Sequence, residues 1–166
     1  MNVEIAGLWI SAGHNFVGRH GLAPREHSAV PVRRIECAAG RGVRGDRYFD
    51  HRPDFKGQIT FLATEVLEEV REALSLRAIE PGALRRNVLT RQVDLNVLIG
   101  QTFELGGILF AGIEECRPCH WMNRAVAPGT EVLLRGRGGL RASILTDGVL
   151  RTGNTQLHFA SEKLVT

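Results

Sequence analysis

Residues 102–114 read Thr-Phe-Glu-Leu-Gly-Gly-Ile-Leu-Phe-Ala-Gly-Ile-Glu, two short runs of strand-forming residues joined by Gly106 and Gly107. Both glycines tolerate a positive φ, which a tight hairpin turn requires. The stretch therefore predicts a β-hairpin with strands over residues 102–105 and 108–114, and it is the strongest sign that the fold is mainly β.

Further strands are predicted on both sides of this hairpin. Runs with alternating or β-branched residues lie between turns rich in glycine. They cover residues 3–11, 30–39, 58–62, 87–90, 140–146 and 155–159. So many short strands favour a closed or half-closed β-barrel, because closure removes exposed sheet edges.

One or two short helices interrupt the strands. In residues 64–74, Val66, Leu67 and Val70 fall at helical spacing, with Thr64 as the expected N-cap and Glu65 favourable in the first turn. A second helical stretch, residues 120–127, ends before a Pro-Gly pair. No repeat or linker divides the chain, so we expect a single domain over residues 1–166.

The composition is that of an ordinary globular protein. The chain has 166 residues, of which 43% are hydrophobic and 23% charged. No window approaches the ~18 uncharged apolar residues of a membrane span, and the start lacks the basic stretch of a secretory signal. Three cysteines are too few for a disulfide scaffold. We therefore expect a cytoplasmic protein without a membrane partner.

Arginine supplies nearly all of the positive charge. The net charge is +3, and the only lysines are Lys56 and Lys163. A guanidinium group binds phosphate or carboxylate through two parallel hydrogen bonds. The preference for arginine over lysine therefore indicates an anionic ligand, or else reflects only the codon usage of a GC-rich genome. Because the arginines are scattered and aromatic residues make up 6% of the chain, we do not expect a nucleic-acid partner.

A glycine-rich run at residues 40–45 has the spacing G-x-G-x-x-G. In a dinucleotide-binding site the third glycine opens a helix. Here the chain continues through Asp46 and Arg47 to Pro53 without a helical period. We interpret the run as a turn that presents Asp46 and Arg47.

The stretch with the most reactive side chains is Glu-Cys-Arg-Pro-Cys-His at residues 115–120. Its cysteines and His120 match the attachment motif of c-type haem, which requires export. A thioredoxin-like pair needs a βαβ setting, whereas this region is predicted to be rich in strands. A structural zinc site needs four ligands, and the sequence offers no second pair of ligands at a usual spacing. Two packed thiols are the plain alternative. However, Cys119 lies between Arg117 and His120 where a strand meets a helix, a setting that lowers a thiol pKa.

Two arginine clusters are candidates for anion binding. Arg85 and Arg86 precede Asn87 at the start of a strand, and residues 135–139 read Arg-Gly-Arg-Gly-Gly. Arginines supply charge and glycines permit close approach of the backbone, although either cluster also suits a solvated turn.

A polar loop near the start of the chain holds several histidines. His14, His20 and His27 are expected to be exposed, and Asn15 and Arg19 are candidates for the mouth of a pocket.

Taken in order, these motifs resemble the MOSC domain, which is named for the C-terminal part of molybdenum cofactor sulfurase. The matching stretches are residues 45–48, 58–60, 82, 85–87, 94–95, 98–100, 103–106, 117–119, 136–140 and 149–153. The resemblance covers about residues 41–159 and implies a β-barrel of the MOSC or pyruvate-kinase-barrel type.

The resemblance also implies a link to the molybdenum cofactor, a molybdopterin with a phosphate and two thiolates around the metal. In one relative, which reduces amidoximes, the second cysteine of a similar Cys-x-x-Cys stretch binds molybdenum, and it corresponds to Cys119. A stretch near the pterin phosphate of that relative is similar to residues 85–87. The residues expected to hold the cofactor are therefore Arg47, Arg85, Arg86, Asn87, Arg137, Gly138 and Gly139.

The activity implied is an oxidoreductase that reduces small N-hydroxylated compounds. It requires a separate electron-transfer partner, because no electron-transfer module is recognised in the chain. The alternative is a sulfur carrier, in which Cys119 holds a persulfide supplied by a cysteine desulfurase, and a third is a binding module without catalysis. Pyridoxal phosphate needs a Schiff-base lysine, so it is not expected with Lys56 and Lys163 as the candidates.

Overall fold

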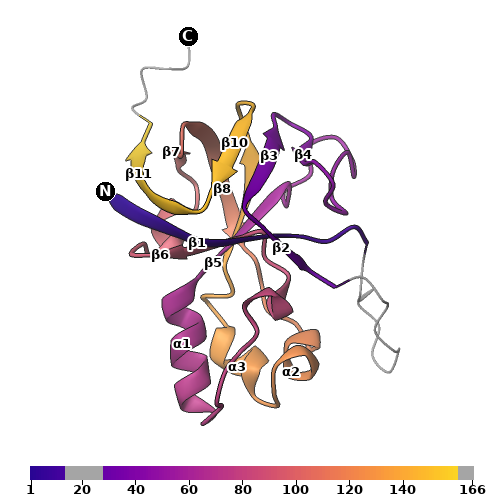
Figure 1. Cartoon of the computed structure of the whole chain (residues 1–166), viewed down its shortest axis with the longest axis vertical. Helices are drawn as coiled ribbons and strands as arrows, with labels where there is room; N and C mark the ends of the chain where they lie inside the picture. The colour runs from indigo at the N-terminus through magenta and orange to yellow at the C-terminus, as the bar shows by residue number, and fades with distance from the viewer. Residues whose placement is uncertain (14–27, 161–166) are drawn as a thin grey trace.

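The computed structural model describes residues 1–13 and 28–160, so the polar loop with the three histidines, Asn15 and Arg19 lies outside the described residues. The strands are β1 (Asn2–Ile10), β2 (Val30–Val32), β3 (Arg34–Ala38), β4 (Gly42–Val43), β5 (Ile59–Ala63), β6 (Val88–Arg91), β7 (Thr102–Leu105), β8 (Ile108–Glu115), β9 (Leu140–Ile144), β10 (Gly148–Arg151) and β11 (Gly153–Phe159). The helices are α1 (Thr64–Ala73), α2 (Trp121–Ala125) and α3 (Thr130–Leu134), with short 3-10 helices η1 (Pro81–Leu84) and η2 (Leu95–Leu98). The three α-helices gather on one side of the molecule and β3, β4 and β10 on the opposite side (Figure 1).

The principal sheet closes into a β-barrel, as predicted. Strands β11, β7, β8, β9, β5, β6 and β1 follow one another in hydrogen-bonded order, and β11 also pairs with β1. The predicted hairpin is formed by β7 and β8, with Leu105 opposite Ile108. The remaining strand of this sheet, β2, pairs with β1 outside the ring.

The barrel is mixed because β5 and β6 run parallel, with Phe61 opposite Val88. A parallel pair needs a crossover connection, and this one carries α1 and η1. The crossover ends immediately before β6, so it delivers Arg85 and Arg86 to the end of a barrel strand.

A second, three-stranded sheet has the order β10-β3-β4. The sequence predicted one strand over residues 30–39, but the structure divides it at Arg33 into β2 and β3. The division has a physical cause, because β2 pairs with β1 in the barrel whereas β3 pairs with β10. Strand β10 was not predicted as a separate strand.

Apolar side chains fill the barrel and a second layer beneath the helices. Inside the barrel, Phe61, Phe103 and Phe110 are fully buried, with ring centroids 5.6–6.2 Å apart. Leu62 on β5 and Leu89 on β6 pack instead against the helices, whereas their neighbours Phe61 and Val88 face the barrel interior. Both faces of β5 and β6 are therefore buried. This burial holds in place the end of the barrel at which Arg85 and Arg86 lie.

The helices differ from the prediction at their ends. Helix α1 begins at Thr64 itself, and its N-cap is Ala63 without a side-chain hydrogen bond. The expected role of Thr64 as N-cap is therefore wrong, because β5 runs straight into the helix. Glu65 lies in the first turn, as expected. Helix α2 lies within the predicted stretch, whereas α3 was not predicted. None of the described helices is long and apolar enough to cross a membrane.

Candidate functional site

A cavity lined by arginines and cysteines lies where three segments of the chain meet, and we call it the arginine cavity. Those segments are the turn after β4, the end of the crossover before β6, and the loop after β8; Phe55 in the turn before β5 and Arg141 in β9 complete the lining. Its guanidinium groups come from Arg47, Arg85, Arg86, Arg117 and Arg141, and its thiols from Cys116 and Cys119. The cavity volume is about 130 Å³, and no carboxylate of the described residues lines it. This composition favours a negatively charged ligand.

The turn that follows the glycine-rich run is built around Asp46. The side chain of Asp46 is buried, and its two oxygens accept hydrogen bonds from the backbone N–H groups of Ser11 (2.9 Å) and Tyr48 (3.3 Å). Nη1 of Arg47 lies 3.5 Å from Asp46 Oδ1, and the Arg47 guanidinium lies 4.6 Å from the centre of the Tyr48 ring. Asp46 therefore holds Arg47 at the cavity. The prediction is confirmed for Arg47, whereas Asp46 is buried rather than presented, and the run itself contains the short strand β4.

Arg85 lies at the end of η1 in a left-handed conformation, with a φ of 59°. Its Nη2 donates a hydrogen bond to the carbonyl of Gly13 (2.6 Å). Burial, together with the nearby charge of Arg47, lowers the pKa of Arg85 to about 10, against the opposing charges of Asp46 and Tyr48. Since the buried charge is unfavourable by itself, an anion in the cavity would stabilise it.

Arg86 is a buried guanidinium that binds main-chain carbonyls from three segments. Nη1 donates to Leu84 (2.9 Å), Nε donates to Gly138 (3.1 Å), and Nη2 donates to both Gly138 (2.9 Å) and Cys116 (3.1 Å). These bonds tie the loop after β8 to the glycine loop, residues 136–139. Arg86 thus lines the cavity, as the sequence led us to expect, and it also holds the cavity wall together.

The glycine loop packs behind this wall, and neither Gly138 nor Gly139 lines the cavity itself. A Cβ at position 138 would lie 2.5 Å from the carbonyl oxygen of Cys116, so only glycine allows the two loops to approach this closely. The N–H of Gly138 donates to the Glu115 carboxylate (3.1 Å), and the N–H of Cys116 donates to the carbonyl of Gly139 (2.7 Å). Gly138 and Gly139 therefore position the cysteine loop.

Asn87 has its amide engaged inside the protein. Its Oδ1 accepts hydrogen bonds from the backbone N–H (3.0 Å) and the hydroxyl (3.1 Å) of Thr60, and its Nδ2 donates to the carbonyl of Trp9 (3.2 Å). The Asn87 side chain thereby joins β5 to β1, immediately before β6 begins its parallel pairing with β5. Thr60 lines the cavity, whereas Asn87 does not.

The three cysteines differ in their surroundings. Cys119 is exposed at the cavity, and Cys116 is buried there. The pKa of Arg141 is raised overall. Burial acts to lower this pKa, but the charge and hydrogen bond of Cys116 and the charge of Glu114 have the larger combined effect. Cys37 packs in the barrel core, where burial raises its pKa to about 12. Cys119 is therefore the thiol that solvent and ligands reach.

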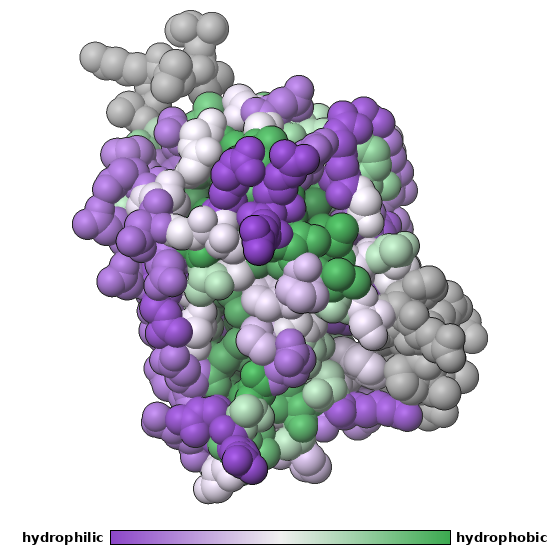
Figure 2. Space-filling model, viewed as in Figure 1, coloured by the Kyte–Doolittle hydropathy of each residue, from purple (hydrophilic) through white to green (hydrophobic). Residues whose placement is uncertain are grey.

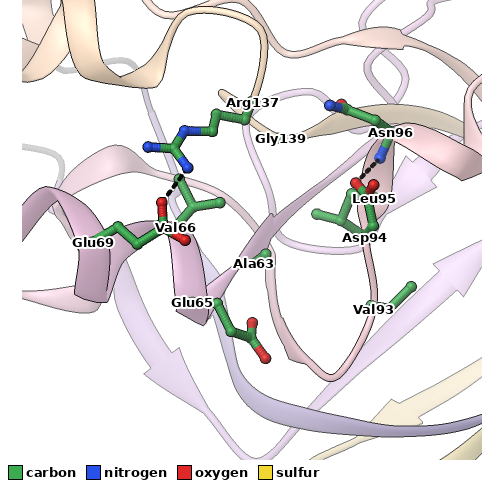
Figure 3. Close-up of a pocket in the computed structure, with 10 residues that line it drawn as sticks. All are labelled: Ala63, Glu65, Val66, Glu69, Val93, Asp94, Leu95, Asn96, Arg137 and Gly139. Atoms are coloured by element: carbon green, nitrogen blue, oxygen red, sulfur yellow. Dashed lines mark hydrogen bonds and ion pairs between the residues drawn. The ribbon is translucent and has the colours of Figure 1, made fainter.

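Arg137 is not brought into the arginine cavity, although the sequence grouped it with Arg85 and Arg86. It lines a different cavity of about 460 Å³, which we call the carboxylate cavity, together with Glu65, Glu69 and Asp94. Figure 3 shows its side chain reaching across to the helix that carries Glu69, with which it forms an ion pair. Gly139 lines the carboxylate cavity as well, so the loop borders this cavity directly and reaches the arginine cavity only through its bonds to Arg86 and Cys116.

Two arginine-cavity residues were missed by sequence reasoning as site candidates. Arg141 lies in β9 between buried Leu140 and Ala142, where alternation alone predicts only a partly exposed position. Phe55 lies in the turn before β5, and its ring centre is 5.0 Å from that of Tyr48. Nothing in the local pattern distinguishes either residue from an ordinary strand or turn position.

The described residues contain no cluster of three or more His, Cys, Asp or Glu side chains that could hold a metal ion. A metal in the arginine cavity would therefore need further ligands from a cofactor, with Cys119 as the accessible protein ligand.

Comparison with known proteins identifies the class. The MOSC domain matches residues 31–155, and the chain therefore belongs to the MOSC domain family. No curated protein matches it. Among solved structures, the YuaD protein from Bacillus subtilis has a TM-score of 0.73 at 18% identity, over 97% of this chain and 98% of that one.

Two further structures share the fold. YiiM from Geobacillus stearothermophilus has a TM-score of 0.70 at 15% identity, over 98% of this chain and 77% of that one. YiiM from Escherichia coli has a TM-score of 0.61 at 15% identity, over 92% of this chain and 70% of that one. All three structures therefore share the fold of this chain.

Proposed function

We propose that this MOSC protein binds the molybdenum cofactor in the arginine cavity, with Cys119 as a sulfur ligand of the metal, and reduces N-hydroxylated compounds. The observation that carries the proposal is one exposed thiol at a cavity lined by five arginines and, among the described residues, by no carboxylate. A soft thiolate suits molybdenum, and convergent guanidinium groups suit a phosphate. The residues present therefore fit both the metal and the anionic end of the cofactor.

The size of the cavity limits which part of the ligand it encloses. A water molecule occupies about 30 Å³, so a cavity of about 130 Å³ admits a group such as a phosphate. The remainder of a larger ligand would lie over the mouth, beside Tyr48 and Phe55. When bound, the cofactor would supply a metal centre for two-electron chemistry.

The protein's own groups have separate tasks in this proposal. Arg47 and Arg85 supply charge from one side of the cavity, and Arg141 from β9. Arg86 keeps the loop of Cys119 in place through its bonds to Cys116 and Gly138. In the overall reaction the N–O bond breaks, an external electron-transfer partner supplies two electrons, solvent supplies two protons, and water leaves.

Metal analysis tests the proposal. The protein is produced in a host that makes the cofactor, and molybdenum and pterin are measured together with N-hydroxyl reduction by a chemical reductant. We expect stoichiometric molybdenum in the wild type and its loss in Cys119→Ser, whereas Cys116→Ser retains most of it. Wild-type protein without molybdenum and pterin would remove the proposal, as would equal loss in both variants.

The exposure of Cys119 also supports a second candidate, the sulfur carrier. The Cys119 thiolate would attack the terminal sulfur of a desulfurase persulfide, the S–S bond of the donor would break, and the donor thiolate would leave. The arginines would then stabilise the persulfide anion. Intact mass after incubation with a cysteine desulfurase tests this candidate: a gain of about 32 Da, one sulfur atom, supports it, and an unchanged mass excludes it.

A further inference from the structure

The second sheet carries an arginine patch on its exposed face, separate from the arginine cavity. Arg34 at the start of β3 lies directly opposite Arg151 at the end of β10, and Arg33 precedes them in the turn. All three side chains are exposed. Like charges in directly opposite positions of an antiparallel pair are destabilising, so this pair is costly for the fold.

These arginines are also uncompensated. Within residues 1–13 and 28–160, the side chains of Arg33, Arg34 and Arg151 make no hydrogen bond or ion pair. Some exposed arginines are compensated, as Arg41 is by Asp50 and Arg91 by Glu68. The two opposed guanidinium groups of Arg34 and Arg151 have no such carboxylate partner among the described residues.

The neighbours of the patch identify the kind of surface. Val149 shares the exposed face of β10 with Arg151, since the two lie two residues apart, and its side chain is 38% exposed. Figure 2 shows strongly hydrophilic side chains next to hydrophobic ones in the upper part of the molecule, where Figure 1 places β10 and β3. Arginine is enriched at protein interfaces, and no aromatic side chain on β3 or β10 offers a nucleic-acid base a stacking platform.

A groove next to the patch could receive an acidic side chain. It has a volume of about 300 Å³ and is lined by Ile10, Arg34, Ile35, Glu36, Arg44 and Gly45. Arg44 lies 3.8 Å from Glu36, so Arg34 is the groove's unpaired cation among the described residues. The groove adjoins the turn that carries Arg47 to the arginine cavity.

From these observations we infer that the exposed face of β3 and β10 is a docking surface for an acidic protein, whose carboxylates pair with Arg33, Arg34 and Arg151. This inference is independent of the proposed function, because it concerns a different surface and is tested on the protein without cofactor.

The first test measures binding to poly-L-glutamate, a minimal acidic polypeptide, at physiological salt. The double variant R34E/R151E is compared with R77E/R135E, which changes the net charge equally at two exposed positions elsewhere. We expect affinity to fall about tenfold in R34E/R151E and less than about twofold in R77E/R135E. Absence of wild-type binding, equal weakening in both variants, or tighter binding of a 20-mer single-stranded oligonucleotide would each overturn the inference.

The second test measures stability. The single variant R151E places a glutamate opposite Arg34, so we expect the thermal unfolding midpoint to rise by about 1–3 °C while poly-L-glutamate affinity falls. The double variant R34E/R151E restores like charges, so its midpoint should stay near that of the wild type. A midpoint in R151E that is unchanged or lower would show that the arginine pair is not repulsive and would contradict the inference.

Discussion

One loop, residues 136–139, lies between two cavities of opposite chemistry: it lines one of them and is bonded to the wall of the other. On one side its Gly138 carbonyl is held by Arg86, which lines the arginine cavity. On the other side its Arg137 lines the carboxylate cavity together with Glu65, Glu69 and Asp94. The carboxylate cavity is the larger, at about 460 Å³ against about 130 Å³. The proposed function therefore rests on the charge and the exposed thiol of the smaller cavity, and not on cavity volume.

Arg86→Ala should have the largest effect on the folded protein. It removes bonds to three carbonyls and leaves those of Cys116 and Gly138 without this buried donor. We expect the free energy of unfolding to fall by about 3 kcal/mol, measured by urea denaturation. Arg86→Lys keeps the charge but cannot form the same set of bonds, and it should lie between the alanine variant and the wild type. If Arg86→Ala were as stable as the wild type, its role in the wall would be wrong.

Gly138→Ala should cost about 2 kcal/mol, because a Cβ there would lie 2.5 Å from the carbonyl oxygen of Cys116. Gly136→Ala is the matched control. A Cβ at that position meets no atom within 4 Å, and only its φ of 80° is unfavourable, a cost of about 1 kcal/mol. Denaturation of both variants measures the difference, and a larger effect at position 136 would contradict the close approach of the two loops.

Arg85→Gln should weaken sulfate binding about tenfold, because it removes one charge from the arginine cavity. In the wild type, affinity should also fall as the pH rises through about 10, where Arg85 loses its proton, and this dependence should be smaller in the variant. Asp94→Asn in the carboxylate cavity is the control and should leave the affinity unchanged. Calorimetric titration measures all three proteins. Equal weakening by both substitutions would show that sulfate does not distinguish the two cavities.

Arg137→Ala should have the smallest effect. Its ion pair with Glu69 is partly exposed, and pairs of this kind contribute about 0.5 kcal/mol after solvent screening. Sulfate affinity in the arginine cavity should not change. A loss comparable to that of Arg86→Ala would show that both sides of the loop contribute equally to its position.

The sequence predicted those parts of the fold that depend on local pattern. The hairpin of β7 and β8 follows from two glycines between strand-forming runs. The division of residues 30–39 at Arg33 does not, because it depends on which distant strands β2 and β3 pair with. Thr64 matched an N-cap by residue type, but β5 leads directly into the helix and leaves no separate cap position.

The candidate site was predictable to a similar extent. Arg85, Arg86 and Cys119 were grouped through the MOSC resemblance, and the structure brings them to one cavity. Arg137 was grouped with them by the same resemblance, yet its side-chain direction is set by Glu69 on a helix far along the chain. Arg141 was missed because one arginine in an alternating strand has no distinctive signal. Whether the grouped residues hold a cofactor stays a prediction.

The pairing of β1 with β11 has a consequence for folding. Asn2 lies opposite Gln156, so β1 must pair with a strand far along the chain before the ring can close. Contacts this distant in sequence slow folding, and until they form, β1 lacks one of its two neighbours in the ring. Closure of the ring should therefore be a late and slow step in folding.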